Sequence, residues 1–281
     1  NATLAALGQC VSGLFLSAGR ESRLAQRYVD ELQIKVSSLA DSVAGLSGGN
    51  QQKIVLGKWL AAAPRVGVAL SGGMDSAVLL AWAVKRHGTV HTLNFNYGSK
   101  HSRKEIAMAR LLAQNCGAVF TEVDLPFFGT LFTSSLLLSG EEIPDGPYRA
   151  DSISSTVVPF RNGIMLSVAA GYAETHAIPL VLIASHAGDH PVYPDCTNDF
   201  IEAMSRAATL GTFAGVRIEA PFAGLDKRAI ARIGRDMGVD FTRTWSCYKG
   251  LDLHCGTCAT CLERKYALEH DSGLDPTRYL A

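Results

Sequence analysis

Four cysteines stand close together near the end of the sequence. Seven residues separate the first from the second, and two residues separate each later pair: Cys247, Cys255, Cys258 and Cys261. Short loops at this spacing can turn all four sulfur atoms toward one point, and four thiolates are a common ligand set for tetrahedral zinc. Four sulfur ligands leave no open position for catalysis. The spacing therefore predicts a structural zinc site.

A glycine-rich turn joins an apolar segment to a helical pattern. The run 66–70 predicts a strand, and the run 77–84 predicts a helix. This order directs backbone N–H groups and the positive end of the helix dipole at an anion. Glycine permits close approach of a phosphate, serine offers a hydroxyl group, and Asp75 is suited to hold either Mg²⁺ or the loop itself. The residues expected to bind ATP are Leu70, Ser71, Gly72, Gly73, Met74, Asp75 and Ser76.

The string from Ser71 to Ser76 resembles the signature of the PP-loop ATP pyrophosphatases. These enzymes split ATP into AMP and pyrophosphate to activate a substrate. No lysine follows the glycines, so the string is not a Walker A loop. The resemblance predicts adenylation chemistry with ATP and Mg²⁺.

An earlier Leu-Ser-Gly-Gly, at 46–49, belongs to a different pattern. Together with Trp59 and Leu60 it closely resembles the signature-helix region of sugar-importer ABC ATPases, over about residues 28–63. The sequence has no Walker A or Walker B segment to accompany it, so the fragment would not hydrolyse ATP alone. We interpret residues 1–63 as an ABC-ATPase-like, non-catalytic fragment. A docking or regulatory role is the alternative.

The elements that position these residues alternate between strand and helix. Further strands are expected at 90–95, 118–123 and 181–183, and further helices at 103–115 and 163–176. This alternation predicts an α/β, Rossmann-like fold in which helices cover both faces of a parallel sheet. Ligands of such sheets bind beyond the carboxyl ends of the strands, where the glycine-rich turn would lie.

Three domains follow from this pattern. They are a short helical appendage at 1–63, a nucleotide-binding synthase domain at 64–240 and a zinc-binding lobe at 241–281. The segment 126–156 is rich in glycine, serine and proline and has weak periodicity. It could form a lid, a dimer contact or a long surface loop.

Composition narrows the class of function. The 281 residues are 47% hydrophobic, which is enough for a full core. The formal net charge is zero, so nothing in the composition favours nucleic acid over a small-molecule substrate. The seven cysteines are an odd number, which fits a reducing compartment better than a framework of disulfides. No apolar run reaches the roughly 20 residues that a membrane span requires. We therefore expect a soluble, cytoplasmic protein.

Polar residues gather where the expected strands and helices meet. They occupy the segments 96–101, 158–162 and 185–196. In a parallel sheet the strand ends lie at the same edge as the nucleotide loop, so these segments are candidates for substrate contacts. Asn162 and Asp195 also have an alternative role as helix caps, which accept hydrogen bonds from backbone N–H groups.

Together these motifs resemble the 7-cyano-7-deazaguanine synthases in order and spacing, from about Val66 to Ala267. The matching pieces are residues 71–76, 96–98, 158–162, 193–196, 244–248 and the four cysteines. The resemblance implies that 7-carboxy-7-deazaguanine, ammonia and ATP are converted to the nitrile that precedes queuosine and related modified bases. It also implies a homodimer that acts on small molecules, with no membrane and no nucleic acid required.

The resemblance and the residue types imply roles for single side chains. Arg161 is suited to the substrate carboxylate or the α-phosphate, and Asp195 to the N–H edge of the guanine-like base. Candidates for moving protons from ammonia are Lys100, His101, His186 and His190. The expected catalytic residues are Asp75, Ser76, Lys100 and Arg161. The expected substrate-binding residues are Tyr97, Arg161, Asn162, Asp189, His190, Tyr193 and Asp195.

Two positions depart from the family pattern. Asn96 stands where an acidic residue usually precedes Tyr-Gly, and Thr197 stands where an arginine often follows the cysteine. These changes bear on the substrate and leave the ATP chemistry untouched. The alternatives are a PP-loop enzyme that adenylates a different acceptor, in protein or nucleic-acid modification, and a non-catalytic nucleotide-binding scaffold.

Overall fold

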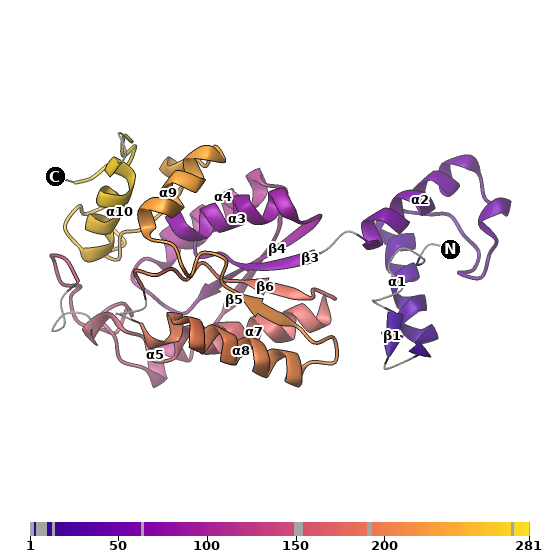
Figure 1. Ribbon diagram of the computed structural model, residues 1–281, viewed down its shortest axis with the longest axis horizontal. Helices are drawn as coiled ribbons and strands as arrows, with labels where there is room; N and C mark the ends of the chain where they lie inside the picture. The colour runs from indigo at the N-terminus through magenta and orange to yellow at the C-terminus, as the bar shows by residue number, and fades with distance from the viewer. Residues whose placement is uncertain are drawn as a thin grey trace. The chain divides into compact units, whose positions relative to one another are not determined.

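The structure is a computed structural model of the 281-residue chain. It describes residues 3, 10–12, 15–62, 65–148, 154–189, 193–270 and 273–280. The chain divides into two compact units, Asn1–Pro64 and Arg65–Ala281, both drawn in Figure 1. Each unit has a hydrophobic cluster of its own.

The first unit is a small, mainly helical body. Helix α1 (Ala18–Glu31) packs against α2 (Gly48–Ala62), and a short antiparallel hairpin of β1 (Val11–Ser12) and β2 (Phe15–Leu16) precedes them. The 3-10 turn η2 (Val43–Gly45) leads into α2, which begins at the glycine pair of the ABC-like string. The non-catalytic role of this fragment stays a prediction.

The second unit is built on a five-stranded sheet in which all neighbouring strands are parallel. Their order across the sheet is β5-β4-β3-β6-β7. The chain moves outward from β3 to β5 and then crosses to the other side at β6, so the strand order reverses between β3 and β6. The strands are β3 (Arg65–Ala69), β4 (Thr89–Asn96), β5 (Val119–Asp124), β6 (Leu180–Leu182) and β7 (Arg217–Glu219).

Helices cover both faces of this sheet (Figure 1). Helices α3, α4 and α9 lie on one face, and α7 and α8 lie on the other. The helices are α3 (Met74–Arg86), α4 (Ser102–Asn115), α7 (Arg161–Thr175), α8 (Asn198–Gly211), α9 (Lys227–Asp236) and α10 (Ala259–Glu269). The predicted α/β, Rossmann-like fold is confirmed. Among the described residues, every helix is too short or too polar to span a lipid bilayer.

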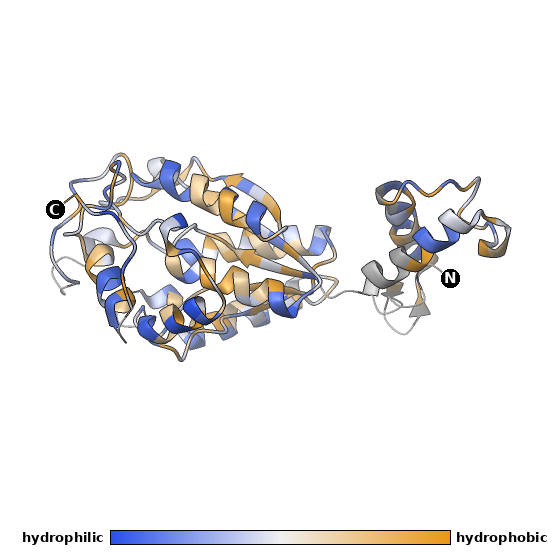
Figure 2. Cartoon of the chain, turned by 90° about the horizontal axis from the view of Figure 1, so that it is seen from above, coloured by the Kyte–Doolittle hydropathy of each residue, from blue (hydrophilic) through white to orange (hydrophobic). Residues whose placement is uncertain are grey.

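The layers follow from the hydropathy of the residues. Figure 2 shows hydrophobic strands between helices whose outer sides are hydrophilic. On one face of the sheet Val66 and Val68 pack with Leu79 of α3, and on the other Val181 packs with Ala169 of α7. Parallel strands that are buried on both faces need apolar residues at nearly every position, which β3 and β6 provide.

The C-terminal segment packs against the nucleotide loop. The backbone N–H of Trp245 donates to the carbonyl of Gly72 at 2.9 Å. Arg264 of α10 is buried and donates to Thr244 Oγ1 at 2.8 Å and to the carbonyl of Phe241 at 2.6 Å. These contacts hold the four-cysteine segment beside the edge of the sheet where the loop lies.

The segment 126–156 is mostly irregular but well packed where it is described. It contains the short helix α5 (Phe128–Leu131), and Leu136, Leu137 and Ile143 are buried. Its backbone is joined to the end of β4, because the N–H of Lys100 donates to the carbonyl of Leu136 at 2.9 Å. A role of this segment as a lid or a dimer contact stays a prediction.

Candidate active site

A cavity of about 240 Å³ opens at the carboxyl ends of the strands. Leu70 follows β3, Tyr97 follows β4 and Ser185 comes shortly after β6, and all three line it. Other walls come from α4, α7, α9 and the C-terminal segment. The cavity lies where the strand order reverses, which is the usual place for ligands in open α/β sheets.

The turn after β3 is shaped by Gly72. Its φ of 89° lies in the region that L side chains rarely adopt. Helix α4 passes directly against this turn, and the carbonyl oxygen of Glu105 is the atom nearest to the position that a Cβ would take. The hydroxyls of Ser71 and Ser76 lie 3.0 Å apart. The loop thus places two hydroxyl groups and the N-terminus of α3 at the cavity, which is the arrangement that binds a phosphate.

Replacing Gly72 with alanine should destabilise the fold and weaken ATP binding. A Cβ atom would lie 2.4 Å from the carbonyl oxygen of Glu105 and 3.0 Å from the backbone nitrogen of Ala109. Left-handed backbone strain and overpacking together should cost about 2–4 kcal/mol of unfolding free energy. Denaturant unfolding measures this loss. Gly171→Ala is the matched control, because that exposed helical position has open space around it and should be neutral or stabilising.

Asp75, in the first turn of α3, has one carboxylate oxygen engaged and one without a partner. Its Oδ2 lies 3.5 Å from Lys227 Nζ and 3.8 Å from His186 Nε2. Its Oδ1 is buried and accepts no hydrogen bond from any described residue. A buried carboxylate oxygen without a donor is costly, and a hard divalent cation satisfies it. Asp75 therefore fits a metal ion that accompanies a nucleotide.

Lys227, at the start of α9, is a buried cation among carboxylates. Its Nζ lies 3.0 Å from Glu263 Oε2 as well as close to Asp75. Burial disfavours its charge, but Asp75, Glu263 and Asp189 raise its pKa above the ordinary value. The side chain stays an ammonium and brings a positive charge to the loop. The sequence analysis missed it, because a lysine after the N-cap residue Asp226 is typical of an ordinary helix start.

Arg161, the first residue of α7, is a second cation in the cavity. Its Nη1 donates to the hydroxyl of Tyr97 at 3.1 Å. Burial disfavours its charge, but Tyr97, Tyr248 and Tyr193 raise its pKa well above the ordinary value. None of the described carboxylates forms an ion pair with it. The guanidinium is therefore charged and free to bind an anionic ligand.

Asn162 and Asp195 form a helix cap. Asp195 Oδ2 accepts a hydrogen bond from the backbone N–H of Asn162 at 2.8 Å, and Asn162 Nδ2 donates to the carbonyl of Asp195 at 3.2 Å. Asn162 also lines the cavity, while Asp195 does not. The carboxylate of Asp195 is thus occupied at the N-terminus of α7. Its contact with a purine-like base stays a prediction.

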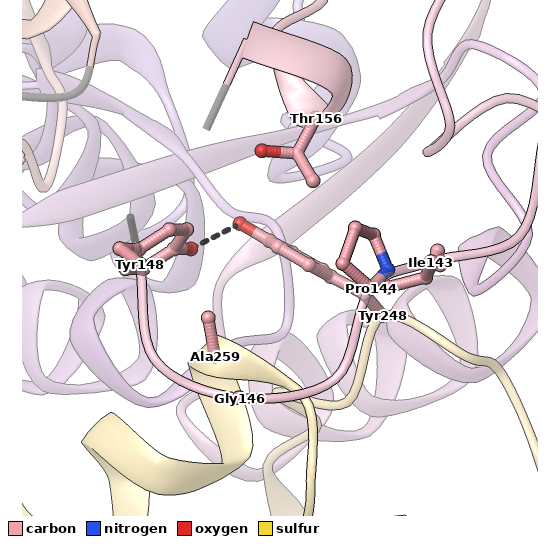
Figure 3. Close-up of a pocket in the computed structure, with 7 residues that line it drawn as sticks. All are labelled: Ile143, Pro144, Gly146, Tyr148, Thr156, Tyr248 and Ala259. Carbon is pink, nitrogen blue, oxygen red and sulfur yellow. Dashed lines mark hydrogen bonds between the residues drawn. The ribbon is translucent and has the colours of Figure 1, made fainter. Parts of the chain in front are cut away.

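Three tyrosine hydroxyls gather on one wall of the cavity. The hydroxyls of Tyr148 and Tyr248 lie 3.2 Å apart, and a dashed line joins them in Figure 3. The hydroxyl of Tyr193 lies 3.5 Å from each. Tyr148 and Tyr248 also line a small neighbouring cavity beside Pro144. Burial raises the pKa of Tyr148 and of Tyr248 well above the ordinary value. The hydroxyls of Tyr148 and Tyr248 therefore stay protonated and can donate to a polar ring.

The four cysteines converge as their spacing predicts. Their sulfur atoms all lie within 4.8 Å of one another, and all four residues are buried. Tetrahedral coordination at a metal–sulfur distance of about 2.3 Å would separate the sulfurs by about 3.8 Å. Cys255 Sγ and Cys261 Sγ lie 3.8 Å apart. The backbone N–H groups of Cys255 and Cys258 donate to sulfur atoms of the cluster, which favours bound thiolates. The cluster therefore fits a metal with four sulfur ligands.

The other predicted residues lie in different places. Lys100 Nζ donates to the carbonyl oxygens of Gly140 and Glu141, and Lys100 is not among the residues that line the cavity. His190 falls outside the described residues. Asp189 and Tyr193 line the cavity, as do all the predicted loop residues except Gly72. The cavity thus brings together most, but not all, of the expected site.

The two residues that depart from the family pattern lie outside the cavity. Asn96 Nδ2 donates to Asp124 Oδ1 at 2.9 Å, and Thr197 caps α8 by accepting from the N–H of Phe200. Neither residue is among those that line the cavity. The two unusual residues therefore serve local structure where the chain is described.

Three features define a PP-loop nucleotide-binding protein. They are the parallel sheet, the loop that presents glycine and serine hydroxyls to a phosphate, and the cationic cavity at the carboxyl edge of the sheet. The family model described as "Queuosine biosynthesis protein QueC" matches residues 65–272. The chain belongs to this family. Residues 1–64 lie outside the match.

Curated relatives agree with the family match. A "7-cyano-7-deazaguanine synthase" from Desulfotalea psychrophila is 53% identical over 213 residues, covering 76% of this chain and 97% of the relative. A protein of the same name from Porphyromonas gingivalis is 51% identical over 213 residues, covering 75% and 96%. Among solved structures, "Structure of NMN synthetase from Francisella tularensis" has a TM-score of 0.42 at 16% identity, covering 81% of this chain and 77% of that one.

Proposed function

We propose that this chain is an ATP-dependent ligase that converts 7-carboxy-7-deazaguanine and ammonia into 7-cyano-7-deazaguanine. One observation carries the proposal: every residue that lines the main cavity falls within 65–272, the part that the family model matches. Two relatives that are more than half identical over about this part are named 7-cyano-7-deazaguanine synthases.

The reaction needs two activations of one carbon atom. A carboxylate is a poor electrophile, so adenylation turns one of its oxygens into a leaving group and releases pyrophosphate. Ammonia then displaces AMP and gives the amide. A second ATP adenylates the amide oxygen and releases pyrophosphate. That oxygen then leaves with AMP, and loss of the two N–H protons gives the nitrile. Each molecule of product therefore consumes two molecules of ATP.

The loop and Lys227 are placed to serve both activations. The N–H groups at the start of α3 and the hydroxyls of Ser71 and Ser76 would hold the β- and γ-phosphates, and Lys227 would neutralise the charge that grows as pyrophosphate leaves. Asp75 would hold Mg²⁺, because its buried Oδ1 has no donor among the described residues. When bound, Mg²⁺ lowers the negative charge of the phosphates.

Arg161 and the tyrosines are placed to bind the acceptor. The unpaired guanidinium of Arg161 suits the substrate carboxylate or the α-phosphate. The hydroxyls of Tyr148, Tyr193 and Tyr248 can donate to and accept from the polar groups of a heterocyclic ring. These contacts would orient the carboxylate toward the loop. Holding the reacting atoms in a fixed geometry lowers the entropic cost of the reaction.

We assign the metal at the four cysteines as zinc, because buried tetrahedral sulfur sites are typical of this ion. With no open position, the ion would supply structural rigidity to the segment that carries Trp245 and Tyr248. A homodimeric state and a cytoplasmic location rest on the family resemblance and stay predictions.

Nucleotide analysis tests the proposal with the full chain. The protein is incubated with ATP, Mg²⁺ and ammonium, with and without 7-carboxy-7-deazaguanine. We expect AMP and pyrophosphate, formed only when the carboxylate is present. AMP without dependence on that carboxylate would indicate a different acceptor, and the absence of AMP would favour a nucleotide-binding scaffold. ADP with phosphate would contradict PP-loop chemistry altogether.

A further inference from the structure

Glu105 and His101 form a pair at the cavity that no motif assigned. Both line the cavity, and His101 is the residue that precedes α4 while Glu105 lies in its first turn. Glu105 Oε2 lies 3.5 Å from His101 Nε2. The backbone of Glu105 packs against Gly72, so the pair stands next to the phosphate loop.

The contacts of His101 fix where its protons lie. Its Nδ1 is 3.1 Å from the carbonyl oxygen of Tyr248. A carbonyl oxygen can only accept, so Nδ1 carries a hydrogen, and in the neutral ring Nε2 then has a lone pair. That lone pair faces the carboxyl group of Glu105. A carboxylate opposite a lone pair is unfavourable, which favours the protonated form of Glu105 over the charged one.

The proposed reaction requires a group that can take up a proton at this place. Attack of ammonia on the acyl adenylate forms a C–N bond, and the C–O bond to AMP breaks with its electron pair leaving on AMP. The nitrogen then carries three hydrogens and a positive charge. One N–H bond must break, with its electron pair retained by nitrogen, before the neutral amide exists. Among the cavity residues, Asp75 and Lys227 are engaged with each other at the phosphate loop. Glu105, in contrast, has no cationic partner within ion-pair distance among the described residues other than the weakly basic His101.

We propose that Glu105 is the catalytic base that accepts the proton from the ammonia-derived nitrogen, and that His101 is the positioning residue that holds its carboxyl group. This inference rests on the proposed synthase activity. The side chain of Glu105 is 19% exposed and lines the open cavity, so the accepted proton can leave to solvent before the second activation.

The electrostatics of the site agree with this assignment. Burial raises the pKa of Glu105 to about 8, while Arg161 acts in the opposite direction. Burial lowers the pKa of His101 to about 4, so its ring is neutral at physiological pH. The titratable groups that face the pair from other segments are Tyr97, Arg161 and Tyr248, with Cys258 acting on His101 through its charge.

The first test compares wild type with Glu105→Gln at several pH values. With free ammonia held constant, we expect wild-type kcat for nitrile formation to rise through about pH 8. Glu105→Gln should lose about a hundredfold in kcat together with that rise. Carboxylate-dependent exchange of pyrophosphate into ATP precedes the attack of ammonia and should stay within a few-fold of wild type. Glu122→Gln, at an exposed site away from the cavity, is the control and should match wild type.

A second readout needs no activity. The raised pKa of Glu105 contributes stability that is fully present below its ordinary value of 4.5 and is lost as the pH rises through about 8. The Tm of wild type should therefore fall relative to that of Glu105→Gln between pH 5 and about pH 9, by several degrees.

The outcomes separate the two proposals. No carboxylate-dependent exchange in wild type would mean that the proposed function fails. Normal nitrile formation by Glu105→Gln, with the wild-type pH profile, would overturn the role of Glu105 while leaving the synthase activity intact. A Tm difference that does not change with pH would show that Glu105 does not titrate in this range, which would overturn its role as the base.

Discussion

Replacing Asp75 with asparagine should lower kcat by about a hundredfold to a thousandfold. The substitution removes the charge that would hold Mg²⁺ at the buried Oδ1, and it puts an amide where the phosphates need a cation. The apparent affinity for Mg²⁺ should fall as well. Steady-state kinetics with Mg²⁺ varied at saturating ATP measures both effects.

Asp75→Asn should reduce the stability of the fold much less than it reduces the activity. Lys227 keeps Glu263 at 3.0 Å as a partner, so its charge is not left alone. Asp236→Asn is the matched control, because Asp236 is exposed at the end of α9, and it should keep wild-type kinetics. A loss of less than fivefold in Asp75→Asn would contradict the assignment of Asp75 as the metal ligand of the nucleotide.

Replacing Cys258 with serine should release the metal and loosen the C-terminal segment. Ligands at a structural metal site contribute folding energy directly, so the unfolding free energy should fall by about 5 kcal/mol. Trp245 and Tyr248 line the cavity from this segment, so ATP and substrate binding should weaken too. Metal analysis by mass spectrometry, thermal unfolding and ATP titration check the three effects.

A second cysteine provides the control for this experiment. Cys116 is half-buried at the end of α4 and is not part of the four-sulfur cluster. Cys116→Ser should keep one metal per chain and cost about 1 kcal/mol or less. Retention of the metal and of wild-type stability by Cys258→Ser would show that the cluster is not a structural site.

Much of the sheet was predictable because its strands carry strong local signals. β3 and β6 are continuous apolar runs, and the predicted strands at 66–70, 90–95, 118–123 and 181–183 match β3, β4, β5 and β6 within one or two residues. β7 was not predicted, because three residues with charged side chains at Arg217 and Glu219 give no apolar run. It is a strand only because it pairs with β6.

The helices of the C-terminal third show which signals were overlooked. α9 has the N-cap residue Asp226, whose side chain accepts from the N–H of Ala229, and apolar residues recur at Ile230 and Ile233. Capping and periodicity would have predicted this helix. Its prediction would have placed Lys227 at a helix start, but only the tertiary fold brings that start to the nucleotide loop.

The site was predictable where one short string holds all of its members. The phosphate loop, Arg161 and the cysteines each belong to such a string, and each reaches the cavity or the cluster. Lys227, Glu105 and Tyr148 come from separate segments and meet the loop only through the tertiary path of the chain. Burial then sets the pKa values of such residues, as it does for Glu105. The burial of a residue depends on the tertiary fold and cannot be predicted from the neighbouring sequence.

The most direct test of the central claim follows the nitrogen atom. The full chain is incubated with ATP, Mg²⁺, 7-carboxy-7-deazaguanine and ¹⁵N-labelled ammonium, and products are identified by mass spectrometry. The account predicts the nitrile carrying one ¹⁵N, with two molecules of AMP for each nitrile and the labelled amide as an intermediate. A carboxylate recovered unchanged, from a protein that is folded and holds its metal, would contradict it.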